Sequence, residues 1–185
     1  MNVDPGNLRI RFYPERILRQ KAEPVDLTAN VVDVALHMVD LMHEAEGIGL
    51  AAPQVGLPWR LFVVHIPPGE GRDASSDLPT ATQAPVVFVN PELSDPSRNL
   101  EPLEEGCLSL PEIRGDVIRP TEVSVTATGL DGQRFTMRAG GLLARCIQHE
   151  YDHLDGVLIL DRMIQVHRAQ VEPLVRALER RGGVR

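Results

Sequence analysis

The sequence predicts one domain that combines α-helices with β-strands. Apolar residues recur at three- and four-residue steps around 28–45, 139–155 and 171–178, which is the spacing of an amphipathic helix. Short runs rich in β-branched residues lie between the first two of these segments and are typical of strands. The chain has 185 residues with no repeat and no linker, so we expect residues 1–185 to share one core.

The composition is that of an ordinary globular protein and limits the classes of partner that we expect the protein to bind. Hydrophobic residues make up 43% of the chain and charged residues 24%. No apolar run approaches the ~18 residues of a membrane span, and the N-terminus has no signal pattern. We therefore predict a cytoplasmic protein without a membrane partner, whose two cysteines are reduced thiols. The net charge of −7 argues against nucleic-acid binding.

The N-terminal helix is predicted at about 28–45. Thr28 is a candidate N-cap, because its hydroxyl can accept a hydrogen bond from the first turn. Gly47 is a candidate stop signal after the last turn. Before this helix, residues 8–25 form an entry segment, in which Pro14 is suited to open one helical turn.

Five runs of residues that favour strands lie between and after the glycine-rich segments. The dipeptide Asp131-Gly132 predicts a hairpin between the last two runs, and Asn90-Pro91 is expected to end the second. The long polar segment 67–85 is predicted to be a mobile loop between strands of one sheet. The predicted strands are 60–66, 86–89, 114–119, 122–128 and 133–138.

The stretch Gln148–Gly156 contains the pattern His-Glu-x-x-His inside a predicted apolar helix. Residues four apart on a helix share one face, with Cβ atoms roughly 5–6 Å apart, so His149 and His153 can bind one metal ion. Glu150 can then take a proton from a metal-bound water. The alternative is a chance match on a surface helix. The apolar neighbours favour a buried helix, where unpaired polar groups would each cost about 1–3 kcal/mol without a metal.

A catalytic metal site typically combines three protein ligands with one water. Cys146 lies seven residues before His153, which is roughly 10 Å along a helix axis, so it cannot share a metal with both histidines. Cys107 lies in a separate extended segment, 104–111, and has no such restriction. Its acidic, glycine-flanked context favours a ligand over the alternative of a small buried core residue.

Residues 47–56 contain closely spaced glycines, several small residues and Gln54. A dinucleotide-binding loop requires a strand before its glycines and a helix after them. Here a predicted helix precedes and Pro53 follows, so we exclude that function. The glycines instead indicate a backbone that passes close to another group, and the Gln54 amide is suited to hold a carbonyl or an oxyanion.

Three motifs therefore occur in series: Gly47–Gln54, Glu105–Ser109 and Gln148–His153. In this order and spacing the chain resembles the peptide deformylase family, from about residue 8 to residue 180. The resemblance implies an α+β fold in which antiparallel β-sheets surround the central His-Glu-x-x-His helix, with an N-terminal and a C-terminal helix. It also implies a metal-dependent hydrolase that removes the N-formyl group from the formyl-methionine of newly made proteins and releases formate.

The resemblance implies one divalent metal ion per chain, which is ferrous iron in the cell. Zn²⁺, Ni²⁺ and Co²⁺ also accept a mixed sulfur and nitrogen ligand set. A thiolate beside ferrous iron predicts sensitivity to oxygen. The metal ligands would be Cys107, His149 and His153.

The resemblance also implies catalytic and substrate-binding roles. Glu150 would be the general base and acid, and the Gln54 amide and the backbone N–H of Leu108 would stabilise the oxyanion. Arg145 lies near the methionine pocket at a position where the family often has an aliphatic residue. The substrate-binding residues would be Ile48, Gly49, Leu110, Arg114, Leu142 and Cys146.

The segment 164–185 is predicted to be a C-terminal helix and tail. Six arginines and only two acids lie between Arg162 and the end of the chain. A solvated helix face is one explanation, and the resemblance implies docking on the ribosome as another. Pro173 requires the helix to begin near 172 or to kink, because a proline inside a helix costs about 3 kcal/mol. The predicted apolar face consists of Val171, Leu174, Val175 and Leu178.

Two alternative functions remain. A general zinc metallopeptidase shares His-Glu-x-x-His but usually takes its third ligand from a downstream His or Glu, and the only His after His153 is His167. A non-catalytic deformylase-like protein that binds nascent chains or ribosomes would have lost a ligand, the base or the oxyanion residue. Because all of these residues are present, catalysis is the preferred interpretation.

Overall fold

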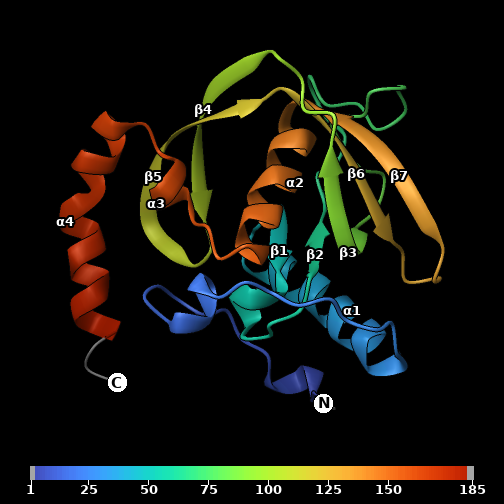
Figure 1. Ribbon diagram of the computed structural model, residues 1–185, viewed down its shortest axis with the longest axis horizontal. Helices are drawn as coiled ribbons and strands as arrows, with labels where there is room; N and C mark the ends of the chain where they lie inside the picture. Colours follow the sequence, from blue (N-terminus) through green and yellow to red (C-terminus); the bar gives the residue numbers. More distant parts are fainter. Residues whose placement is uncertain (1–2, 183–185) are drawn as a thin grey trace.

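The computed structural model describes residues 3–182, which form two antiparallel sheets with a helix between them (Figure 1). The predicted α+β fold is confirmed. Residues 183–185 of the predicted C-terminal tail lie outside the described residues. The sheet of five strands contains, in order, β1 (Gly49–Ala51), β2 (Leu61–Val64), β3 (Val86–Ser94), β6 (Glu122–Thr128) and β7 (Arg134–Gly140). The second sheet pairs β4 (Leu100–Cys107) with β5 (Leu110–Pro120). The helices are α1 (Ala29–Glu44), α2 (Gly141–Leu154), α3 (Ile159–Arg162) and α4 (Gln165–Gly182).

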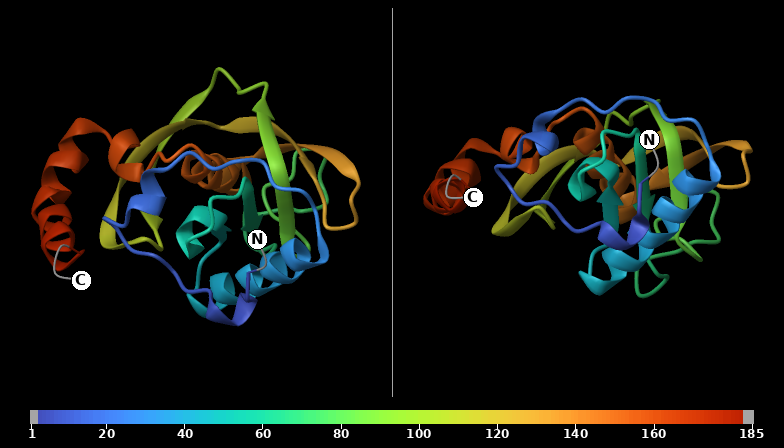
Figure 2. Two further views of the ribbon diagram at one scale, coloured as in Figure 1. Left: turned by 60° about the horizontal axis from the view of Figure 1, so that its bottom comes forward. Right: turned by 90° about the horizontal axis from the view of Figure 1, so that it is seen from below.

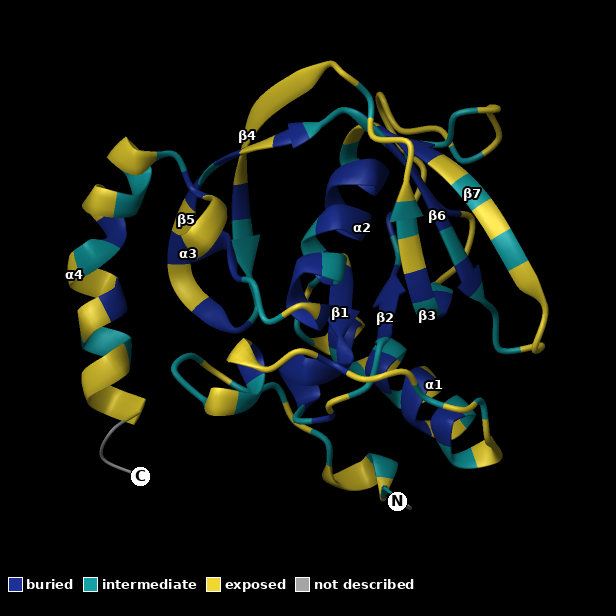
Figure 3. Cartoon of the chain, in the orientation of Figure 1, coloured by how far each residue is buried: buried dark blue, intermediate teal, exposed yellow. Residues whose placement is uncertain are grey.

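Strand β2 divides the apolar core into two clusters. Successive side chains of a strand point to opposite faces of its sheet. Leu61 and Val63 therefore pack with α1, and Phe62 and Val64 pack with α2. All four side chains are fully buried, because helices cover both faces of the sheet at this point (Figure 3). Apolar packing therefore holds helix α2 in the interior of the protein.

A third apolar cluster joins β5 to the two C-terminal helices. Val117 of β5 packs with Val171 and Val175 of α4. Helix α4 lies at the edge of the molecule, outside β5, in all three views (Figures 1 and 2). Tyr13 also donates a hydrogen bond of 2.8 Å to Glu179, which ties α4 to the N-terminal segment. Among residues 3–182, no helix is both long and apolar enough to cross a membrane.

The predicted N-terminal helix is confirmed as α1. The hydroxyl of Thr28 accepts a hydrogen bond of 3.4 Å from the backbone N–H of Val31 and so caps the first turn. After the last turn, the backbone N–H of Gly47 donates to the carbonyl of Met42 over 2.8 Å. The chain then enters β1 directly, which brings the glycine-rich segment to the end of α1.

The prediction that the second strand ends at Asn90-Pro91 was wrong, because β3 continues to Ser94. The pairing of β3 with β6 shifts register between Val89 and Glu92, and Asn90 has a φ of 49°. This irregularity accommodates Pro91, which has no N–H for the ladder. The Asn90 side chain exchanges two hydrogen bonds of 2.8 and 2.9 Å with the backbone of Val25, so a local contact stabilises the bend.

The predicted C-terminal helix is present, but one predicted member of its apolar face was wrong. Helix α4 begins at Gln165 and runs through Pro173, which excludes the alternative of a start near 172. Glu172 accepts hydrogen bonds from Arg168 and Arg176, each four residues away, and the pair Glu172–Arg176 spans the proline. Leu174 was predicted to face the core but is 41% exposed, because the inner face follows Val171 and Val175.

The β4–β5 hairpin is longer than the predicted strand at 114–119. Strand β4 was not predicted as a full strand because its residues 100–104 are all exposed and show no alternation. The predicted hairpin at Asp131-Gly132 is present between β6 and β7, and Gly132 has the positive φ of 78° that such turns require. Residues 67–85 connect the paired strands β2 and β3. Their mobility stays a prediction.

Candidate metal centre

Three potential metal ligands converge where the β4–β5 hairpin meets α2. One ligand atom from each of Cys107, His149 and His153 lies within 4.8 Å of the others. The Cys107 sulfur is 3.3 Å from Nε2 of His153, and the two imidazole rings are 5.1 Å apart. Both histidine side chains are largely buried. The donor set of one sulfur and two nitrogens fits a divalent metal ion.

The local folding of two elements creates this convergence. The two histidines are four residues apart on α2 and therefore share one face. Cys107 ends β4 at a point where the hairpin register shifts, so that it pairs with Leu110 instead of continuing the ladder. Cys146 is not among the converging atoms; its thiol instead donates to the carbonyl of Ile48 over 3.4 Å.

Glu150 lies beside the candidate ligands with one oxygen unsatisfied. Its side chain is 3% exposed, and Oε2 has no hydrogen-bond partner among residues 3–182. Burial raises the pKa of Glu150 to about 7. A Cβ atom on Gly49 would collide with this carboxylate and would lie 2.8 Å from the Cys146 sulfur. The glycine therefore leaves space for the acid, as expected for a backbone in close approach.

Gln54 is held in one orientation by both ends of its amide. Its carbonyl oxygen accepts from the backbone N–H of Ala51 over 2.8 Å. Its Nε2 then faces the hairpin, 3.2 Å from Oγ of Ser109 and 3.5 Å from the Cys107 sulfur. Because Gln54 is 1% exposed, the amide N–H groups are aimed at the candidate centre with little freedom to turn.

A cavity of about 460 Å³ opens beside this centre. Strand β1 forms one wall as the outermost strand of its sheet, so one edge of its backbone has no partner strand within residues 3–182. Glu46, Glu104 and Glu112 also line the cavity, and Arg114 is 4.0 Å from Glu104. All of the residues that the sequence suggested for substrate binding line this cavity: Ile48, Gly49, Leu110, Arg114, Leu142 and Cys146. Gln54, Leu108 and Glu150 line it as well.

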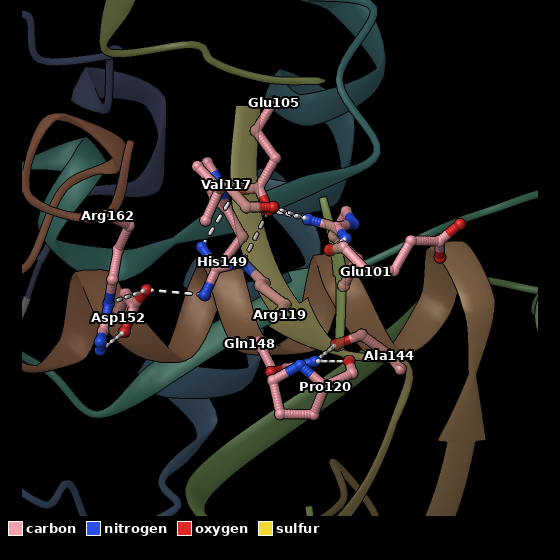
Figure 4. Close-up of polar contacts among 11 residues, drawn as sticks. Glu101, Glu105, Val117, Arg119, Pro120, Ala144, Gln148, His149, Asp152 and Arg162 are labelled. Atoms are coloured by element: carbon pink, nitrogen blue, oxygen red, sulfur yellow. Dashed lines mark hydrogen bonds and ion pairs between the residues drawn. The ribbon is translucent and has the colours of Figure 1, made fainter. Parts of the chain in front are cut away.

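The buried carboxylate of Glu105 orients His149 (Figure 4). The sequence alone had indicated no role for Glu105. Nδ1 of His149 is 3.0 Å from Oε2 of Glu105, an arrangement that directs Nε2 toward the candidate centre. Burial alone would raise the pKa of Glu105, but hydrogen bonds from His149 and Arg119 lower it to about 2. For His153 burial has the opposite effect and lowers the pKa well below its usual value. The imidazole therefore stays neutral and able to bind a metal.

The same carboxylate belongs to a buried ionic network. Arg119 donates to Glu105 over 2.6 and 3.0 Å and to Asp152 over 2.8 Å. Arg145 donates to Glu105 over 2.8 Å, and Arg162 reaches Asp152 over 2.7 Å from the solvent side. One feature of the sequence indicates this network. Arg145 lies within the apolar pattern of a helix, and a buried arginine requires a partner. The partners could not be read from the sequence, because they lie on other elements.

Comparison with known proteins decides the family. A sequence model described as Polypeptide deformylase matches residues 7–169. The chain belongs to the polypeptide deformylase family. A peptide deformylase of Agrobacterium fabrum is 40% identical over 161 residues, which cover 86% of this chain and 89% of that protein. A peptide deformylase of Salinibacter ruber is 43% identical over 155 residues, which cover 83% and 79%. The crystal structure of peptide deformylase from Ehrlichia chaffeensis has a TM-score of 0.84 at 31% identity, covering 95% of this chain and 98% of that one.

Membership of this family establishes the reaction. The chain is a metal-dependent hydrolase that removes the N-formyl group from the N-terminal formyl-methionine of peptides. The residues Cys107, His149 and His153 form a candidate site for its metal. The fold and the reaction expected from the three motifs are thereby confirmed.

Proposed function

We propose that Cys107, His149 and His153 bind one divalent metal ion and that this ion is ferrous iron in the cell. The convergence of their three ligand atoms within 4.8 Å is the observation that supports this ligand set, and ferrous iron is the ion that the resemblance to the family implies. When bound, such an ion lowers the pKa of water and polarises a carbonyl group. Zinc, nickel and cobalt suit the same donors. Metal analysis of protein purified without oxygen tests the identity, and a dominant metal other than iron would contradict it.

Glu150 is the general base and then the general acid of the proposed mechanism. Its carboxylate is buried beside the ligands and has an oxygen free of other partners among residues 3–182. A pKa of about 7 suits a group that accepts and returns a proton near neutral pH. Glu150 takes a proton from water as water attacks the formyl carbon, and it delivers the proton to the leaving amine.

The oxyanion of the reaction is stabilised by donors that are already in place. Nε2 of Gln54 faces the candidate centre, and its orientation is fixed through Ala51. We assign the second donor to the backbone N–H of Leu108, which follows Cys107 directly in the cavity wall. Donors fixed in advance need no rearrangement as charge develops.

The peptide substrate is proposed to extend β1 along its free edge. Strand β1 is the outermost strand and lines the cavity through Gly49, which suits backbone pairing with an extended peptide. Leu108, Leu110 and Arg114 also line the cavity. The methionine side chain occupies the apolar part of the cavity, where a flexible thioether packs well. That part is lined by Ile48, Leu142 and Cys146.

We also propose that the substrates are nascent chains in the cytoplasm and that α4 contacts the ribosome. Arg168 and Arg176 of this helix both pair with Glu172. Arg180 and Arg181 are exposed near the end of the helix. A cluster of exposed arginines is suited to bind RNA phosphates. Co-sedimentation with ribosomes, compared with a chain truncated at Ile164, tests this contact. Equal co-sedimentation of both chains would contradict it.

Formate release from a formyl-Met tripeptide tests the mechanism. We expect rapid release by nickel-loaded protein and a loss of at least 100-fold on Glu150→Ala, which removes the base. Metal content of the variant must match that of the parent. Retained activity in Glu150→Ala would contradict the role of Glu150, and cleavage of the unformylated peptide would instead indicate a general peptidase.

A further inference from the structure

The metal centre of this chain is assembled from two elements that are separate in sequence. The β4–β5 hairpin supplies Cys107, and α2 supplies His149 and His153. Neither element alone fixes the distance between the sulfur and the imidazoles. Any group that locks the hairpin onto the helix therefore affects how well the three ligand atoms are placed.

Arg145 makes such a connection with three hydrogen bonds. It lies on α2 one turn before His149 and is 6% exposed. Nη1 donates to Oε1 of Glu105 over 2.8 Å and to the carbonyl of Val117 over 2.9 Å. Nη2 donates to the carbonyl of Glu101 over 2.7 Å. One guanidinium on the helix thus binds both strands of the hairpin, and one of its partners is only two residues from Cys107.

Arg145 and His149 share the same carboxylate. Oε1 of Glu105 accepts from Arg145 and Arg119. Oε2 accepts from Arg119 and lies within hydrogen-bond distance of His149; Figure 4 labels Glu105, Arg119 and His149. The planar guanidinium leaves this carboxylate few alternative rotamers, because its donors have a fixed fork geometry. The orientation of Glu105 in turn sets the orientation of the His149 ring. Groups that orient metal ligands in this way typically change metal affinity by 10–100-fold when they are removed.

We propose that Arg145 is a positioning residue that holds the hairpin and the His149 ring in the geometry required for metal binding. The inference rests on the ligand set proposed above. Arg145 acts through Glu105 and through two hairpin carbonyls, not by contact with the reacting atoms. A purely structural arginine would stabilise the fold but would leave the metal affinity of the folded protein unchanged.

The test compares cobalt binding by the full-length parent and by Arg145→Met. Methionine keeps an apolar stem of similar length but has no donor. We expect the cobalt dissociation constant, measured by chelator competition, to rise about tenfold or more. We also expect a shift of the thiolate-to-cobalt absorption band in the folded variant. Arg145→Lys keeps one cationic donor and should give an intermediate affinity, and it serves if the methionine variant does not fold.

Arg138→Met is the matched control. Arg138 also joins strands through three partners, since it donates to Glu122, to Ser124 Oγ and to the carbonyl of Asp95, but it lies outside the metal centre. Its loss should leave cobalt affinity unchanged. Folded Arg145 variants with parental affinity and spectrum would overturn this inference alone. A parent that binds cobalt without a thiolate band would overturn the ligand set and this inference together.

Discussion

At the scale of single residues, the site depends on the absence of a side chain at Gly49. The carboxylate of Glu150 occupies the space that a Cβ atom would fill there, and the Cys146 sulfur closes the other side. Both neighbours are buried, so neither can move into solvent. The sequence indicated a close approach at this glycine, but the group approached could not be identified without the fold.

We therefore expect Gly49→Ala to reduce activity by about 100-fold or more while the protein stays folded. The added methyl group displaces Glu150, the proposed general base, and a misplacement of about 1 Å can cost 100-fold in rate. Deformylation kinetics and circular dichroism measure the two effects. Gly6→Ala is the control, because its Cβ would meet only an ordinary contact of 3.5 Å. Parental activity in Gly49→Ala would show that the base is free to move.

Gln54→Glu tests the second residue-scale contact. The substitution keeps the shape and the oxygen that binds Ala51, but it replaces the donor near Cys107 with a carboxylate oxygen. Loss of one oxyanion donor typically costs 10²–10³-fold in kcat. We expect kcat to fall by about this factor with little change in KM. A rise in KM with unchanged kcat would assign Gln54 to substrate binding instead.

At the scale of elements, the sequence predicted best where a local pattern determined the structure. Helix α2 was predicted because its apolar residues recur at helical spacing, and the β6–β7 turn because of Asp131-Gly132. Strand β3 was shortened because Pro91 signals an end, whereas the contact between Asn90 and Val25 absorbs the bend. The network around Glu105 was not predicted, because its members come from β4, β5 and α2. Pairing between side chains of different elements produces no local sequence pattern.

Helix α4 gives the element-scale prediction. Pro173 lies inside this helix on an exposed position, where it removes a hydrogen bond without adding core contacts. We expect Pro173→Ala to raise the free energy of unfolding by about 1–3 kcal/mol. Denaturant unfolding measures the change, and Leu174→Ala on the neighbouring exposed position should have little effect. An unchanged or lower stability would mean that the helix has already adapted to the proline.

At the scale of the whole molecule, the apolar clusters are continuous with the site. Strand β2 packs against α1 on one face and α2 on the other, and β5 packs with α3 and α4. Helix α2 carries both proposed histidine ligands and core residues such as Leu143 and Ile147. This sharing supports the proposal of a single domain, because the site cannot be separated from the core that holds its helix.

Metal removal tests this coupling across the molecule. An ion that binds only the folded chain at 100 times its dissociation constant adds about 2.7 kcal/mol of stability, which corresponds to roughly 5–10 °C in Tm for a chain of this size. We expect a chelator to lower Tm by about this amount, while circular dichroism shows that the fold persists, because the three apolar clusters pack without the ion. Cys107→Ser should show a much smaller shift, since it lacks the thiolate. An equal shift in parent and variant would place the stabilising ion elsewhere.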